Sequence, residues 1–130
     1  MKHNEYHLQK SITAYLRLQY PNVIFLSTGT SLKLTAPQQV RNKAINSDKF
    51  AIPDLIILHP NRFFHGLCME LKVESPFKKD GSIKASQGDH LEKQNETINQ
   101  LGKLGYYAAF CWSFGDAKNI IDYYMGLVEK

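Results

Sequence analysis

Ile52-Pro53-Asp54-Leu55-Ile56-Ile57-Leu58 and Cys68-Met69-Glu70-Leu71-Lys72-Val73 are the two stretches that decide the fold of this chain. Both predict β-strands, over 52–58 and 66–73, because they are rich in large apolar residues and a proline-containing turn separates them. Side chains alternate along a strand, so Glu70 and Lys72 share one face of the second. We expect an antiparallel hairpin, with Asp54 beside Glu70 and Lys72.

The rest of the chain alternates helices with short strands. Apolar spacing predicts helices over 3–19, 36–46, 89–103 and 116–128, and apolar runs predict strands over 23–27 and 106–112. Thr35-Ala36-Pro37-Gln38 has the form of a capping box, and the thin apolar face behind it predicts a satellite helix over the site. The segment 74–88 predicts a long polar loop. This order indicates one α/β domain over 1–130.

The composition is typical of an ordinary globular chain, with 43% hydrophobic and 12% aromatic residues. No apolar run approaches the roughly 18 residues that span a membrane, and the N-terminus lacks an apolar signal core. We therefore expect a cytoplasmic protein without a membrane partner. Cys68 and Cys111 lie in apolar runs without a CxxC pair, which predicts buried, reduced thiols.

The positive charge of the chain permits a polyanionic partner. The formal net charge is +4 and the pI is near 9.0. Cations in the loops and turns are the candidates for nucleic-acid binding: Arg41, Lys43, Lys49, Lys78, Lys79 and Lys84. An ordinary solvated surface would have a similar composition, so these residues allow the partner without requiring it.

Polar side chains fall at core-facing positions of two predicted helices. Glu5 and Gln9 lie within the apolar stripe of the first helix, and Gln94 lies within that of the helix over 89–103. Such groups need partners when they are buried. Glu5 could instead be exposed in the first helical turn, where the helix dipole favours a carboxylate. Gln94 could instead be satisfied by a backbone carbonyl.

Three carboxylates and one lysine carry the chemistry of the hypothesis. Crowded carboxylates such as Glu5, Asp54 and Glu70 repel one another, and a hard cation such as Mg²⁺ or Mn²⁺ relieves the repulsion. Such a cation activates water and neutralises charge on a phosphate, and Lys72 could orient that water. The implied reaction is hydrolysis of a phosphodiester.

Other candidate sites are weaker. His3 and His7 have a zinc-binding spacing, but two ligands at a chain end make a poor site. His90 lies near the Gln94 face and could contact DNA or water, although a plain surface histidine is the simpler interpretation. Ser27 and Cys111 have no base nearby in the sequence. No glycine-rich phosphate loop is present, so no organic cofactor is expected.

These motifs resemble the VRR-NUC domain of the PD-(D/E)XK nuclease superfamily, often found as small stand-alone phage or bacterial proteins. The resemblance runs along nearly the whole chain, through Glu5-x-x-x-Gln9, Pro53-Asp54-Leu55, Gly66-Leu67-Cys68-Met69-Glu70-Leu71-Lys72, Leu91-Glu92-Lys93-Gln94 and Ser113-Phe114-x-x-Ala117. One departure is Ile52, which stands where the family usually has glycine.

The resemblance implies a restriction-endonuclease-like αβββαβ core, with a mixed four-stranded sheet flanked by helices. It implies that Asp54 and Glu70 bind the metal, with the Leu71 carbonyl as a possible third ligand. Glu5 would complete the shell directly or through water. Lys72 would be catalytic and Gln94 would support the site. The substrate would be DNA of a particular structure, such as branched or junction DNA, and the protein would be a homodimer.

Two other functions compete with a metal-dependent DNA endonuclease. The first is a DNA-binding module, or a subunit of a larger nucleic-acid complex, that has the nuclease fold without activity. The second is an unrelated α/β interaction protein whose Glu-Leu-Lys is only a surface strand. The second leaves the positions of Glu5 and Gln94 as coincidences.

Overall fold

Helices and strands alternate along the chain in the predicted order. This computed structural model describes residues 2–29, 34–85 and 89–127, without the side chains of residues 2–4 and 89. The elements are α1 (Lys2–Gln19), β1 (Phe25–Ser27), α2 (Ala36–Ala44), β2 (Leu55–Ile57), β3 (Leu67–Leu71), α3 (Asp89–Lys103), β4 (Tyr107–Cys111) and α4 (Phe114–Gly126). The predicted α/β class and mixed sheet are confirmed.

The strands form one mixed sheet in the order β1-β2-β3-β4. β2 pairs antiparallel with β3, as the two deciding stretches predicted, and Ile56 lies opposite Cys68. β4 pairs parallel with β3, because α3 carries the chain back across the sheet. Extending the β2–β3 register by two residues sets Asp54 and Glu70 on the face that also carries Ile56 and Cys68.

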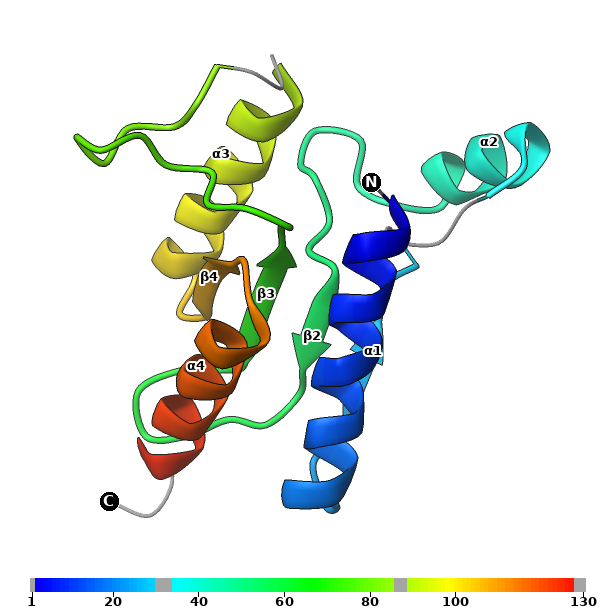
Figure 1. Cartoon of the computed structure of the whole chain (residues 1–130). Helices are drawn as coiled ribbons and strands as arrows, with labels where there is room; N and C mark the ends of the chain where they lie inside the picture. The colour runs from blue at the N-terminus through cyan, green and yellow to red at the C-terminus, as the bar shows by residue number, and fades with distance from the viewer. Residues whose placement is uncertain (1, 30–33, 86–88, 128–130) are drawn as a thin grey trace.

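The two faces of the sheet have different contents. The apolar core lies on one face, where α1 and α4 lie side by side (Figure 1). Leu55, Met69 and Leu71 contribute to it from the strands and are buried. α3 packs beside β4. The candidate site residues therefore lie on the face away from the main core.

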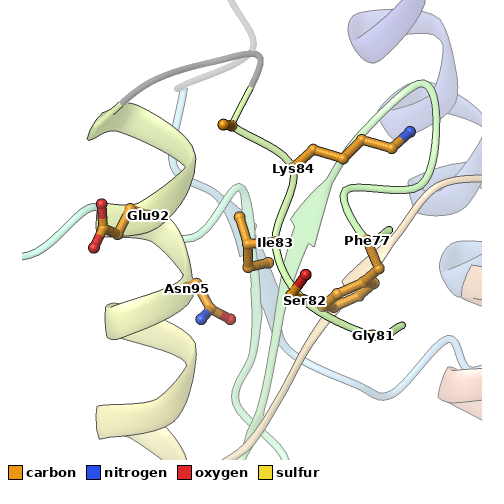
Figure 2. A pocket seen from close by; sticks show the side chains of 8 residues that line it. Phe77, Gly81, Ser82, Ile83, Lys84, Glu92 and Asn95 are labelled. Carbon is orange, nitrogen blue, oxygen red and sulfur yellow. The ribbon is translucent and has the colours of Figure 1, made fainter. Parts of the chain in front are cut away.

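The loop after β3 folds into a small hairpin. Phe77 and Ile83 form an isolated antiparallel bridge, and Gly81 makes the turn with a φ of 89°. The ring of Phe77 packs edge-on against Phe110 at 5.7 Å between centroids. A cavity of about 660 Å³ separates this hairpin from α3, and Asn95 faces it from the helix (Figure 2). The predicted polar loop is thus ordered over its described part.

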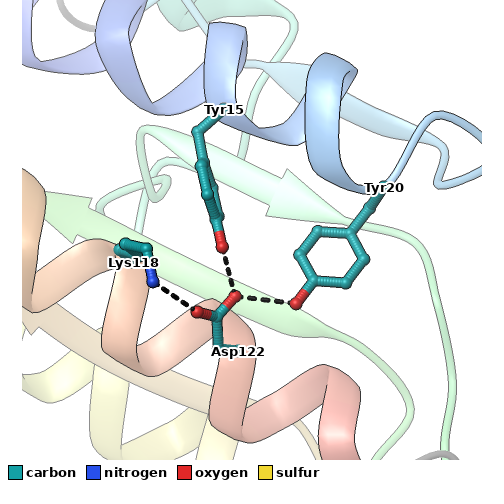
Figure 3. A network of polar contacts seen from close by, with 4 residues as sticks. All are labelled: Tyr15, Tyr20, Lys118 and Asp122. Carbon is teal, nitrogen blue, oxygen red and sulfur yellow. Dashed lines mark hydrogen bonds and ion pairs between the residues drawn. The ribbon is translucent and has the colours of Figure 1, made fainter.

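A polar cluster fastens α1 to α4 (Figure 3). The hydroxyl groups of Tyr15 and Tyr20 donate to Oδ1 of Asp122, at 2.5 and 2.7 Å. Lys118 donates to Oδ2 of the same carboxylate at 3.0 Å. Burial by itself would raise the pKa of Asp122, but the hydrogen bonds from Tyr15, Tyr20 and Lys118 outweigh it and lower that pKa. We call these four residues the Asp122 cluster.

Several predicted boundaries were wrong. The predicted strands 23–27, 52–58 and 66–73 are shorter ladders, 25–27, 55–57 and 67–71. The last helix starts at Phe114 and not at 116, because the Ser113 side chain accepts a hydrogen bond from the Asp116 amide. Its predicted end at Val128 lies outside the described residues.

The satellite helix α2 was predicted correctly in its start and in its lack of core contacts. The Thr35 side chain and the Gln38 side chain form the expected reciprocal capping box. None of the residues of α2 is buried, and the helix ends at Ala44 and not at residue 46. It projects to the side of the body, near the end where α1 begins (Figure 1).

Ile52, which replaces the usual glycine, and the two cysteines are all compatible with the fold. Glycine alone has a positive φ among the described residues, so Ile52 adopts an ordinary backbone conformation. Cys68 and Cys111 are both free and buried, as predicted, and burial raises the pKa of the Cys68 thiol to about 11. Within the described residues, no helix is both long and apolar enough to cross a membrane.

Candidate functional site

Asp54 lies immediately before β2, at the open end of the β2–β3 hairpin, and hydrogen bonds hold it there. Its backbone carbonyl accepts hydrogen bonds from Gln9 Nε2 at 2.9 Å and from the Thr28 amide at 3.0 Å. Its carboxylate Oδ2 accepts from the Leu71 amide at 2.7 Å. A side-chain oxygen thus satisfies an amide that lies just past the end of the β2–β3 ladder. This contact explains why Asp54, which the prediction included in its strand over 52–58, is buried although β2 itself starts at Leu55.

Gln9 holds the backbone of Asp54, a contact that the sequence did not predict. It is 5% exposed, and its side chain joins α1 to the backbone of Asp54. Its place in the apolar stripe of α1 was the available signal, since a buried amide needs a partner. The partner lies 45 residues away, which sequence spacing does not indicate.

Glu70 and Lys72 lie next to Asp54 as predicted. They are 4% and 6% exposed, and Asp54 is 3% exposed. Glu70 belongs to β3, whereas Lys72 follows it and donates its amide to the Cys111 carbonyl at 2.9 Å. Alternation along the strand keeps both side chains on the face opposite Met69 and Leu71.

Asp54 and Glu70 are two buried carboxyl groups in contact, so like charges and not opposite charges meet here. Burial raises the pKa of Glu70 well above its ordinary value, and a hydrogen bond and charge repulsion from Asp54 raise it further. The charge of Lys72 offsets part of this effect, and Glu5 adds a smaller repulsion. The two carboxyl groups therefore favour sharing a proton or a cation over ionising together.

Gln94 lies on α3 beside His90, a residue that the charges of Lys72 and Asp54 influence. It is 7% exposed, and its Nε2 lies 3.2 Å from Nε2 of His90, one helical turn earlier. Its Oε1 is buried and has no hydrogen-bond partner among the described residues. The predicted alternative, in which a backbone carbonyl satisfies this glutamine, is not what the structure shows. A buried acceptor without a donor indicates a place for water or a ligand.

His90 is exposed, as the simpler interpretation predicted, but its ring also contacts Gln94, near whose face the sequence placed it. Burial lowers its pKa, and the charge of Lys72 lowers it further while that of Asp54 opposes the shift. These influences place the imidazole within the field of the site. The spacing of four residues between His90 and Gln94 on a helix was the signal for their contact.

Glu5 lies at the edge of the site. It lies in the first turn of α1, as the alternative predicted, but it is half-buried and not exposed, and its charge raises the pKa of Glu70. Across residues 2–29, 34–85 and 89–127, no three His, Cys, Asp or Glu side chains are gathered closely enough to hold a metal ion. Asp54 and Glu70 are thus the carboxylates that the structure brings together.

The segment before β2 is tied to α3. The Ala51 amide donates to Thr97 Oγ1 at 2.9 Å, and Lys93 Nζ donates to the Asp48 carbonyl at 3.0 Å. Because Asp54 follows this segment and Gln94 lies between Lys93 and Thr97, these bonds set the distance between the strand and helix sides of the site.

The candidate nucleic-acid-binding cations lie in three separate places. Lys78, Lys79 and Lys84 belong to the hairpin beyond β3, and Arg41 and Lys43 lie on α2. Lys49 precedes β2 and lies over the ring of Phe50 at 5.8 Å. All except the half-buried Lys84 are exposed. These cations thus belong to three separate segments of the chain.

Comparison with known proteins identifies the fold. No family model matches the sequence, and no curated protein matches it. Among solved structures, the chain is similar to one described as a VRR_NUC domain protein, with 20% sequence identity and a TM-score of 0.63. The similarity covers 95% of this chain and 89% of the other. The predicted resemblance is confirmed at the level of the fold, and this chain has the fold of a VRR_NUC domain.

Proposed function

We propose that this protein is a Mg²⁺- or Mn²⁺-dependent DNA endonuclease of the PD-(D/E)XK type that prefers branched or junction DNA. The observation that carries the proposal is the contact between two buried carboxyl groups, Asp54 and Glu70, with Lys72 on the same face. Two buried carboxyl groups in contact destabilise a fold unless a proton or a cation compensates their charge. The VRR_NUC fold supports the proposal because it is a nuclease fold.

The donor set fits a hard divalent cation. Asp54 and Glu70 would hold it, with the Leu71 carbonyl as a third oxygen and Glu5 contributing through water. Oxygen donors of this kind, completed by water, suit Mg²⁺ and Mn²⁺. The bound ion would supply activation of water and neutralisation of phosphate charge.

The protein's own residues would orient the reactants. Lys72 is buried beside Glu70, so its ammonium group can donate to the scissile phosphate or to the attacking water at low local dielectric. Gln94 offers its unpartnered Oε1 as an acceptor for that water. Gln9 holds Asp54 in place through the backbone.

The exposed cations would hold the DNA backbone. Lys78, Lys79 and Lys84 would contact phosphates on one side of the site, and Arg41, Lys43 and Lys49 on the other. Such contacts position DNA without reading its sequence. We include in the proposal a homodimer acting in the cytoplasm, and sedimentation at several protein concentrations tests the dimer.

The test is cleavage of plasmid, nicked and branched DNA with Mg²⁺ or Mn²⁺, compared with a chelator. We expect metal-dependent cutting that Asp54→Ala and Lys72→Ala each reduce by at least about 100-fold. Asp48→Ala and Lys103→Ala remove an exposed carboxylate and an exposed lysine, so they serve as matched controls and should cut normally.

Two outcomes would overturn the proposal. Wild-type protein that binds DNA but cuts with neither metal would indicate the inactive DNA-binding module. Protein that fails to bind DNA even at low salt, where phosphate contacts are strongest, would indicate an unrelated interaction protein.

A further inference from the structure

The contact between His90 and Gln94 places a titratable ring beside a buried carboxamide. Their Nε2 atoms are 3.2 Å apart, which is hydrogen-bond distance. An amide nitrogen can only donate, so in this arrangement the imidazole nitrogen accepts and His90 is neutral, with its proton on Nδ1. The Gln94 Oε1 is then left buried without a donor among the described residues.

Protonation of His90 would reverse this arrangement. An imidazolium ring donates from both nitrogens, so its Nε2–H would oppose the N–H groups of the Gln94 carboxamide. Two facing donors are unfavourable, and rotation of the carboxamide by about half a turn restores a hydrogen bond from His90 to Oε1. The group that occupies the former position of Oε1 is then a donor.

We propose that His90 is a positioning residue that directs the Gln94 carboxamide oxygen at the attacking water, and that protonation of His90 turns this oxygen away. The proposal rests on the nuclease function proposed above. It assigns to His90 a role at the site, in place of the plain surface histidine that the sequence suggested.

The charges around His90 favour its neutral form. Lys72, which follows β3, and Lys93 on α3 itself lower its pKa, while Asp54, which precedes β2, raises it. Burial is the largest influence and also lowers it, and the net result is a pKa below the ordinary 6.5. Near pH 7 the ring is therefore in the state that accepts from Gln94.

The first test uses metal-free protein and does not depend on activity. The side-chain amide resonances of Gln94 and the ring resonances of His90 are followed by NMR from pH 8 to pH 4.5. We expect both to change with one shared midpoint below about 6.5. In His90→Gln the Gln94 amide resonances should not titrate over this range. Gln94 resonances that stay constant while His90 titrates in the wild type would overturn the proposal.

The second test separates the acceptor from the donor at position 90. His90→Gln supplies an acceptor that does not titrate, so it should keep cleavage at pH 7 within about threefold of wild type. It should remove from the pH profile the acidic step whose midpoint matches the NMR titration of His90, while any step from Glu70, whose pKa is raised, remains. His90→Lys supplies a permanent donor and should lower kcat by about 10- to 100-fold at every pH, with KM nearly unchanged. His59→Gln is the control, because His59 lies beyond the other end of β2.

The outcomes distinguish this inference from the nuclease function. If the wild type cuts and His90→Gln keeps the acidic step with the NMR midpoint of His90, the positioning role of His90 is wrong and the nuclease function stands. If the wild type does not cut under any condition, the nuclease function fails, and the shared NMR titration alone decides whether His90 controls Gln94.

Discussion

Two buried or half-buried polar clusters in this molecule have opposite electrostatic character. In the Asp122 cluster, one carboxylate accepts from two hydroxyl groups and an ammonium group, and the pKa of Asp122 is lowered. At the candidate site, two carboxyl groups face each other, the pKa of Glu70 is raised, and Gln94 Oε1 has no partner in the described part of the chain. The first cluster satisfies its charge within the chain, whereas at the second the charge of Lys72 offsets only part of the burial and repulsion that raise the pKa of Glu70.

The difference supports a structural role for the Asp122 cluster and agrees with the ligand-binding role proposed for the second cluster. The Asp122 cluster joins α1 to α4 over the main core, so its hydrogen bonds stabilise the packing of the two helices. We expect the site residues to reduce the stability of the metal-free protein, because the charge of Lys72 offsets only part of the burial and repulsion at Glu70. Such a cost at a site is typical of function.

The largest stability effect is expected from Asp122→Ala. The substitution removes the acceptor of Tyr15 and Tyr20 and the ion pair with Lys118, so the free energy of unfolding should fall by about 2 kcal/mol. Urea denaturation at pH 7 measures it. Asp48→Ala is the exposed control and should change stability by less than about 0.5 kcal/mol. An unchanged midpoint for Asp122→Ala would contradict a structural role for the cluster.

Glu70→Gln is expected to raise the free energy of unfolding, whereas Asp122→Ala lowers it. Glu70→Gln keeps the shape of the side chain, removes its charge and lets its amide donate to the Asp54 carboxylate. In chelator at pH 8, the free energy of unfolding should therefore rise by about 1 kcal/mol, while cleavage is lost. Thermal unfolding with and without Mn²⁺ measures both stability and metal binding. A destabilised metal-free variant would show that the Glu70 charge supports the fold.

The pH dependence of stability sharpens the same comparison. The raised pKa of Glu70 means that the folded state binds more protons than the unfolded state above about pH 4.5, so stability falls as pH rises through the folded pKa. The lowered pKa of Asp122 means that stability is lost as pH falls below about 3.8. Glu70→Gln should flatten the first slope, and Asp122→Ala the second.

The sequence predicted the site better than it predicted the Asp122 cluster. Alternation along two strands was enough to bring Asp54, Glu70 and Lys72 to one face, and helical phase placed Gln94 toward the sheet. Tyr15 and Asp122 are half-buried residues of two different helices, 107 positions apart in the sequence. No local sequence pattern therefore relates them. The His90 contact had a helical spacing, but its significance depends on the Gln94 oxygen that has no partner among the described residues, and only the folded structure shows this.

The smallest expected effect concerns the periphery of the site. Lys78 and Lys79 are exposed on the hairpin beyond β3, so removing either charge leaves the buried carboxylates unchanged. Because phosphate contacts are independent of sequence, Lys78→Ala and Lys79→Ala should each weaken DNA binding by only a few-fold and equally for unrelated sequences. Each should also reduce the slope of log K against log salt by about 0.9. Binding is measured in chelator by fluorescence anisotropy, with Lys103→Ala as control. A loss that depends strongly on DNA sequence would mean that these lysines contact bases and that the hairpin, unlike the buried site, takes part in selecting the substrate.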